Sequence, residues 1–192
     1  MNFMKTQFRT FLRDESGVVL AEFLILFPML VWGLIALFAF WDVFRTINIT
    51  QKAAYSIADL LSRQVVVKAT FVDGLQNVLD FLTPNVPASR MRITSIEWDE
   101  PTEKFLLLFS RSPGNQVTAL TATTAQDLAP FVPTLADSET VIVVETWVDY
   151  VPPFDTGVMN FAMGIGNRTF TQLVVTRPRG RRVCLEGTSG CS

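Results

Sequence analysis

The sequence predicts an α+β protein in which a long N-terminal helix is followed by a small antiparallel-sheet ectodomain. Three observations favour this fold class. Residues 18–41 form an almost uninterrupted apolar run, and apolar residues then recur at helical spacing as far as Leu61. Four later segments are rich in β-branched residues and are separated by turn signals.

The apolar run, residues 18–41, predicts a transmembrane helix. At 1.5 Å per residue it would be roughly 36 Å long, enough to cross a hydrocarbon core of about 30 Å. Lys5, Arg9 and Arg13 precede the run and fewer basic residues follow it, which favours a cytoplasmic N terminus. A cleaved signal peptide is the alternative, but the run is longer than an ordinary signal sequence and no clear small-residue cleavage site follows it.

Two residues inside the run are unusual for a membrane helix. Glu22 is its only charged residue, and a charge costs about 2.5–3.5 kcal/mol at the bilayer centre and less near an end. We therefore expect Glu22 to have a function; the simpler interpretation is that it extends towards the lipid headgroups. Pro28 cannot donate a hydrogen bond to the carbonyl of Leu24, so a kink or loosened turn is expected there, with an ordinary tolerated proline as the alternative.

Residues 42–63 predict an amphipathic stalk helix that continues the span. Its apolar and charged residues fall on opposite faces: Val43, Ile47, Ala54, Ile57, Ala58 and Leu61 on one, and Arg45, Lys52, Asp59 and Arg63 on the other. The apolar face has to pack on the globular part of the chain or on a partner.

Residues 64–183 predict a single α+β domain. We expect a helix over residues 71–82, ended by Pro84, and strands over residues 90–98, 104–110, 140–151 and Arg168–Thr176, the first two forming a hairpin. A short helix broken by Pro130 and Pro133 is expected within residues 121–135. The apolar segment 152–167 is expected to cover the sheet, and contact with a partner is the alternative.

The C-terminal region contains two further features. Cys184 and Cys191 are the only cysteines, and in an oxidising compartment they would close a small loop over residues 184–192; two free thiols are the alternative. Arg177, Arg179, Arg181 and Arg182 form a basic cluster that could contact anionic lipid or an acidic neighbour, and a solvated tail is the alternative.

The residues that support the commonest enzyme chemistries are missing. The chain has no histidine, which excludes Ser-His-Asp and Cys-His arrangements and histidine-containing zinc sites. No phosphate-binding loop or dinucleotide fingerprint occurs. The net charge of −2 gives no general attraction to nucleic acid. We therefore expect a protein that is not an enzyme and has no catalytic residue, metal or cofactor.

The polar edge of the apolar run resembles the processing site of type IV prepilins. Gly17 precedes the run, Glu22 follows five residues later, and Phe23 comes next. Residues 14–28, Asp-Glu-Ser-Gly-Val-Val-Leu-Ala-Glu-Phe-Leu-Ile-Leu-Phe-Pro, look more specifically like the TadE/TadF family of tight adherence (Flp) pilus proteins. The resemblance is close over residues 10–45 and looser beyond.

This resemblance implies that a membrane prepilin peptidase removes the leader, residues 1–17, so that Val18 begins the mature chain. It further implies a minor pilin-like subunit that supports or initiates pilus assembly, anchored by a single span in the bacterial inner membrane with its C-terminal domain in the periplasm. The implied partners are other pilin or pseudopilin subunits, inner-membrane assembly proteins, the peptidase and membrane lipid. A signal-anchored periplasmic binding or sensor domain is the alternative function, and an anchored enzyme is a third.

Overall fold

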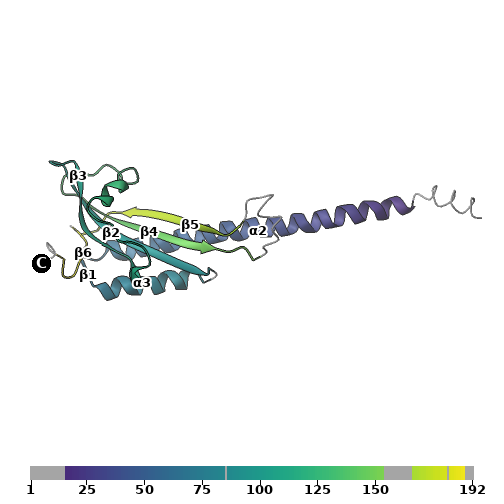
Figure 1. The fold of residues 1–192 in the computed structure, drawn as a ribbon, viewed down its shortest axis with the longest axis horizontal. Helices are drawn as coiled ribbons and strands as arrows, with labels where there is room; N and C mark the ends of the chain where they lie inside the picture. The colour runs from purple at the N-terminus through teal and green to yellow at the C-terminus, as the bar shows by residue number, and fades with distance from the viewer. Residues whose placement is uncertain (1–15, 85, 154–165, 181, 189–192) are drawn as a thin grey trace, which may run out of the picture. The chain divides into compact units, whose positions relative to one another are not determined.

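The computed structural model describes residues 16–84, 86–153, 166–180 and 182–188 (Figure 1). The chain divides into two units, Met1–Trp41 and Asp42–Ser192. Helix α2, Ser16–Ser62, supplies the described residues of the first unit and the first 21 residues of the second, Asp42 to Ser62. The predicted helix over residues 18–63 is therefore present, and it continues on both sides of Pro28.

A four-stranded antiparallel sheet forms the centre of the second unit. Strands β2 (Ala88–Asp99), β3 (Lys104–Arg111), β4 (Thr140–Tyr150) and β5 (Arg168–Thr176) lie in the order β3-β2-β4-β5. The predicted α+β fold class is confirmed, and each predicted strand lies within two residues of an observed one. The register of the β2–β3 hairpin shifts between Ser95 and Ile96, where β3 contains one extra residue.

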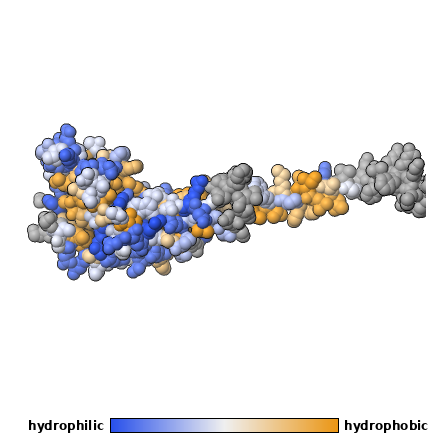
Figure 2. Space-filling view, in the orientation of Figure 1, coloured by the Kyte–Doolittle hydropathy of each residue, from blue (hydrophilic) through white to orange (hydrophobic). Residues whose placement is uncertain are grey.

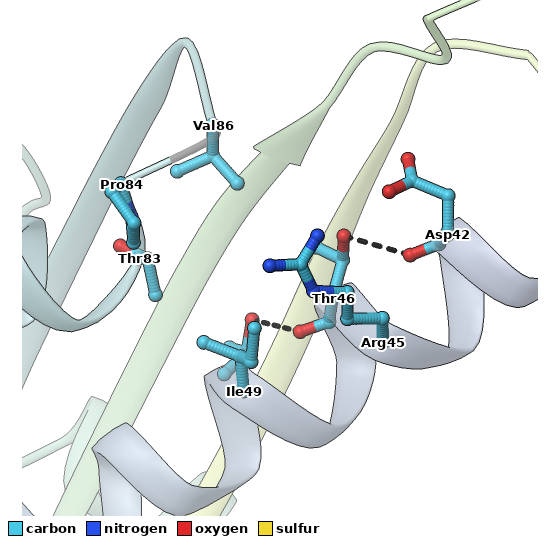
Figure 3. Close-up of a pocket in the computed structure, with 8 residues that line it drawn as sticks. Asp42, Arg45, Thr46, Ile49, Thr83, Pro84 and Val86 are labelled. Carbon is cyan, nitrogen blue, oxygen red and sulfur yellow. Dashed lines mark hydrogen bonds between the residues drawn. The ribbon is translucent and has the colours of Figure 1, made fainter.

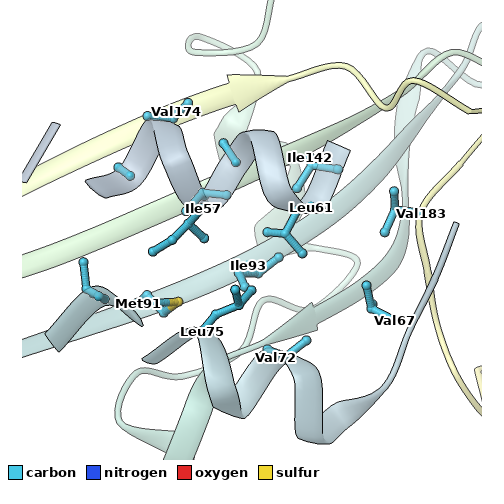
Figure 4. Packing of buried hydrophobic residues seen from close by; sticks show 14 of the residues in the cluster. Ile57, Leu61, Val67, Val72, Leu75, Met91, Ile93, Ile142, Val174 and Val183 are labelled. Carbon is cyan, nitrogen blue, oxygen red and sulfur yellow. The ribbon is translucent and has the colours of Figure 1, made fainter. Parts of the chain in front are cut away.

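Helices α2 and α3 cover one face of this sheet. Helix α3, Ala69–Leu82, buries Val72, Leu75 and Leu79, whose spacing of three and four residues places them on one side of the helix. These side chains form a single core with residues of α2 and with Met91, Ile93, Ile142, Val144 and Val174 of the sheet (Figure 4). The domain buries the second half of the stalk's predicted apolar face, where Ala54, Ile57, Ala58 and Leu61 are all 2% exposed or less, whereas Val43 and Ile47 are half-buried.

The opposite face of the sheet is also partly covered. A second cluster joins Val141 and Val143 of β4 to Ile96, Phe105 and residues of the segment that follows β3. Strand β4 is therefore buried on consecutive residues from Thr140 to Thr146, and Glu145 lies in a covered face instead of facing water. Residues 121–135 contain the expected short helix, but it is the 3₁₀-helix Thr124–Leu128; a second 3₁₀-turn lies at Pro113–Asn115.

A parallel pair of short strands, which the sequence did not predict, joins the C-terminal segment to the domain. Strand β1 (Val66–Val67) pairs with β6 (Cys184–Leu185). The amide of Cys184 donates to the carbonyl of Val65 at 3.0 Å, and Val183 is fully buried in the core shared with α2 and α3. Cys184 and Leu185, which were expected to begin a separate loop, therefore belong to the packed domain.

Candidate functional site

The apolar segment of α2, residues 18–41, is the most unusual surface of the described chain. By length and composition α2 is able to cross a membrane, although a signal sequence near the N terminus has the same properties. Hydrophobic residues dominate this part of the helix (Figure 2). Most of its large apolar side chains are at least one-third exposed: Val19, Leu20, Phe23, Leu24, Ile25, Leu26, Phe27, Met29, Leu30, Val31, Trp32, Leu34, Leu37, Phe38, Phe40 and Trp41.

This exposure has a large free-energy cost in water. Burying apolar surface contributes roughly 25 cal/mol per Å², so a helix with this many exposed Leu, Phe and Ile side chains is not stable alone in water. The described part of the chain covers few of these side chains. The segment therefore needs lipid, or the apolar faces of other helices, as its surroundings.

The proposed processing position lies in the first turn of α2. The helix begins at Ser16, and a Cβ atom placed on Gly17 would meet no other atom within 4 Å. Gly17 is thus not required by packing within the described residues. Residues 1–15 of the expected leader lie outside the described residues.

Glu22 lies on an open face of the helix. Positions 18 and 22 are one turn apart and share that face. Phe23, on the next position, is 57% exposed and stacks on Phe27 with ring centroids 5.2 Å apart. Within the described residues Glu22 is exposed and has no ion-pair partner. If residues 18–41 lie in a bilayer, this carboxylate would be stabilised by extending to the headgroups or by a cation from outside the described chain.

Asp42 marks the point at which α2 enters the second unit. The Tyr150 hydroxyl donates a hydrogen bond of 3.0 Å to Oδ2 of Asp42. Burial is the main cause that raises the pKa of Tyr150, and this hydrogen bond to the Asp42 carboxylate raises it further. The contact joins α2 to the end of β4 and stabilises the domain at its first residue.

A small cavity lies beside Asp42 (Figure 3). Its volume is about 30 Å³, and it is lined by Asp42, Arg45, Thr46, Ile49 and Thr50 of α2 and by Thr83, Pro84 and Val86. The Thr46 hydroxyl donates to the carbonyl of Asp42 at 3.0 Å, and that of Thr50 to the carbonyl of Thr46 at 2.8 Å. One or two water molecules fit in this space, and a substrate does not.

Two larger hollows lie on the surface of the second unit. One, of about 400 Å³, lies between the end of α3 and the start of β2 and includes Asp80, Ser89 and Arg90. The other, of about 390 Å³, is lined by Trp98, Phe105 and residues of the segment 129–135. Among the described residues, no group of three or more His, Cys, Asp or Glu side chains is arranged to hold a metal ion.

Three of the four arginines in the basic cluster form ion pairs within the domain. Arg177 contacts Glu139 at 3.0 Å, Arg179 contacts Asp59 at 2.9 Å, and Arg182 lies 3.7 Å from Glu97. Arg181 lies outside the described residues. The three described arginines therefore contact α2, β2 and the turn before β4, and their side chains remain 46–62% exposed.

Cys184 follows Arg182 by two residues. Cys184 is 4% exposed and disulfide-bonded. Cys191, its predicted partner, lies outside the described residues.

The ion pair between Arg92 and Glu145 is a further structural feature that the sequence did not predict. Arg92 Nε lies 2.7 Å from Oε2 of Glu145, and the two side chains are only 14% and 10% exposed. The guanidinium also donates to the carbonyl of Thr118 and lies over the Trp147 ring, 5.3 Å from its centroid. The two residues are 53 positions apart, and only the pairing register of β2 with β4 would have brought them together.

Comparisons of the chain with protein-family models, with curated proteins and with solved structures found no match.

Proposed function

We propose that the chain is a minor pilin-like subunit that supports or initiates assembly of a tight adherence (Flp) type IV pilus. In this proposal a prepilin peptidase cleaves after Gly17, residues 18–41 anchor the mature chain in the inner membrane, and the α+β domain lies in the periplasm. The subunit acts by associating with other pilin or pseudopilin subunits and with inner-membrane assembly proteins, and it carries out no chemistry of its own.

One observation supports this proposal more than any other. The apolar segment of α2 is exposed along most of its length, begins beside Gly17, and carries the single carboxylate of Glu22. A membrane anchor alone would need the apolar side chains but not the carboxylate, which makes insertion less favourable. Association with like subunits would use both the exposed apolar side chains and the Glu22 carboxylate.

The charge on Glu22 has a natural partner after processing. Cleavage after Gly17 would create a cationic α-amine at Val18, on the face of the helix that also contains position 22. Two unit charges 4 Å apart attract by about 4 kcal/mol at an effective dielectric constant of 20. In a bundle of like helices the Glu22 carboxylate of one subunit would pair with the amine of another, which offsets the cost of both charges.

The domain supports the same function through its core. The continuation of the apolar segment along α2 supplies Ala53, Ala54, Ile57, Ala58 and Leu61 to the main core. The element that would associate in the membrane is therefore also the central helix of the folded domain.

A signal-anchored periplasmic binding or sensor domain is the alternative function. The hollow lined by Trp98 and Phe105 favours it, because an open apolar hollow with two aromatic rings is a suitable place for a small ligand. A ligand bound there at physiological concentration would support this alternative.

Deletion of the gene in its native host tests the proposal. We expect loss or a strong reduction of surface pili by electron microscopy, restored by the wild-type gene on a plasmid. The pilin subunit that forms the filament should still be present in the membrane fraction of the deletion strain. The deletion should affect assembly of that subunit and not its synthesis. Unchanged pili in the deletion strain would overturn the proposal.

A further inference from the structure

The end of the second unit at which α2 enters it, here called the entry end, exposes several apolar side chains. It consists of Asp42 and Phe44 of α2, Phe81 near the end of α3, and Val151 just after β4. Helix α3 ends, strand β2 begins and strand β4 ends on this side of the unit (Figure 1). Three large apolar side chains there are exposed: Phe44 by 61%, Phe81 by 81% and Val151 by 48%. Phe81 is more exposed than every large apolar side chain described in residues 19–41.

The proximity of these residues to Asp42 follows from described contacts. Phe44 is two residues further along α2. Val151 directly follows Tyr150, whose hydroxyl bonds to the Asp42 carboxylate at 3.0 Å. Phe81 lies in the last turn of α3, two residues before Thr83, and Thr83 lines the same 30 Å³ cavity as Asp42 (Figure 3).

Chain connectivity brings the entry end close to the bilayer surface. Asp42 directly follows Trp41, the last residue of the apolar run, and α2 rises by only 1.5 Å per residue. The headgroup region adds about 5–8 Å on each side of the hydrocarbon core. Phe44, which is next to Asp42 along the chain, therefore lies near the depth of the headgroups, and Phe81 and Val151 reach it when this end of the unit faces the bilayer.

We propose that the entry end is a membrane-contact surface, in which Phe81, Phe44 and Val151 insert among the headgroups of the bilayer that holds residues 18–41. The inference rests on the anchoring part of the proposed function. Aromatic side chains are favoured at the membrane–water interface, and exposed phenylalanine is unfavourable in water. The acidic side chains of this end have partners in the domain: Asp42 with Tyr150, Asp80 with Ser89, and Asp149 with Arg90. Of these three carboxylates, that of Asp149 is paired with a cation, whereas those of Asp42 and Asp80 keep their charge and are held by hydroxyl groups of the domain.

Lipid is the favoured occupant because of the position of the three side chains. A partner protein could cover an exposed phenylalanine anywhere on the domain. Phe131, for example, is 62% exposed beside the hollow of Trp98 and Phe105 and lies away from the entry end. The entry-end side chains differ because they adjoin the residue at which the apolar run stops. Contact with a second copy of the chain is an outcome that the experiment below detects separately.

The test uses fluorine NMR of the full-length protein, one chain per nanodisc, in phosphatidylethanolamine and phosphatidylglycerol. Trifluoromethylphenylalanine replaces Phe81 in one sample, Phe131 in a matched control, and Phe27 of the apolar run in a third. For each site the relaxation caused by dissolved oxygen, which concentrates in lipid, is compared with that caused by a water-soluble gadolinium chelate. Circular dichroism checks that the three proteins have the same fold.

We expect the oxygen-to-gadolinium ratio at position 81 to be at least about threefold higher than at position 131, and closer to that at position 27. Equal ratios at positions 81 and 131, with lipid exposure at position 27, would overturn this inference and leave the anchor intact. Aqueous exposure at position 27 would instead overturn the anchor. Protection of position 81 from both reagents would indicate a protein contact and would also overturn the inference.

Discussion

The hydroxyl of Tyr150 donates a hydrogen bond of 3.0 Å to the carboxylate of Asp42, across 108 residues of sequence. Burial, and then this hydrogen bond, raise the pKa of Tyr150 above its ordinary value of about 10. Below that value both the folded and the unfolded chain keep the tyrosine protonated. As the pH rises past it the unfolded chain releases the proton and the folded chain retains it, so the free energy of unfolding falls.

Tyr150→Phe is therefore expected to change how stability depends on pH. At pH 7 the variant should lose about 1.5–3 kcal/mol, the usual net contribution of a hydrogen bond to a charged group. Between about pH 10 and pH 11 its stability should fall less steeply than that of the wild type, because the group that titrates has gone. The measurement is the urea midpoint of the detergent-solubilised full-length protein at each pH. Tyr55, the only other tyrosine, is 63% exposed, and an equal flattening in Tyr55→Phe would contradict this account.

Arg92→Met is expected to destabilise the domain by about 3–5 kcal/mol, because it leaves the Glu145 carboxylate buried without its counter-charge. The matched control is Arg63→Met. Arg63 pairs with Asp59 on the exposed face of α2, with side-chain exposures of 56% and 47%, and such a solvated pair should contribute little to stability. The double variant Arg92→Met/Glu145→Leu should recover most of the loss. Similar urea midpoints for the two single variants would show that burial of the ion pair does not determine the loss of stability when its arginine is removed.

Val183→Ala tests whether the C-terminal segment belongs to the core. Val183 is fully buried beside Val67 and Leu61, so the substitution should cost about 2 kcal/mol through lost burial and a residual cavity. Val65→Ala is the control, because Val65 is 61% exposed and should tolerate the change. A midpoint of Val183→Ala equal to that of the control would mean that the segment after β5 is peripheral.

Glu22→Gln is expected to insert in the membrane as well as the wild type or slightly better, and yet to impair piliation. The substitution lowers the insertion cost and removes the partner of the neighbouring amine. Membrane fractionation measures insertion, and electron microscopy measures pili in a complemented deletion strain. The N terminus of the variant has to be checked first, since uncleaved protein would also fail to assemble. Glu100→Gln, in the exposed turn between β2 and β3, is the control for loss of a carboxylate. Normal pili with Glu22→Gln would contradict the proposed pairing.

The elements of this fold follow closely from local sequence patterns. Helical spacing identified the face of α2 that is buried from residue 54 to residue 61 and half-buried at residues 43 and 47, and β-branched runs located all four strands of the sheet. These patterns work because each element buries a single stripe or face, and its period is therefore visible in a short window.

Features that depend on distant pairing were not predictable in this way. Strands β1 and β6 are each two residues long, too short for a periodic signal, and they meet only after the sheet has formed. The partners of Arg177, Arg179 and Arg182 come from three separate parts of the chain that are far away in sequence. The burial of Glu145 likewise depends on a distant residue, because its carboxylate pairs with Arg92, which also contacts the carbonyl of Thr118 and the Trp147 ring.

The residues of the candidate site, in contrast, were identified from the sequence, and the structure adds little about their function. Gly17, Glu22 and the apolar run are recognisable from sequence because their meaning depends on order along the chain and on contact with lipid or other subunits. The structure adds that Gly17 lies in open space and that the side chains around Glu22 are uncovered. Neither observation identifies the bond that a peptidase cuts, so processing remains the central prediction.

The N-terminal residue of the mature protein tests that prediction most directly. The full-length chain is produced together with the prepilin peptidase of its own host, isolated from membranes, and measured by intact mass and N-terminal sequencing. We predict that the protein begins at Val18, and that Gly17→Phe, produced in the same way, retains the leader, because the peptidase must approach the backbone closely at this bond. A wild-type protein that still carries residues 1–17 in the presence of active peptidase would contradict the account.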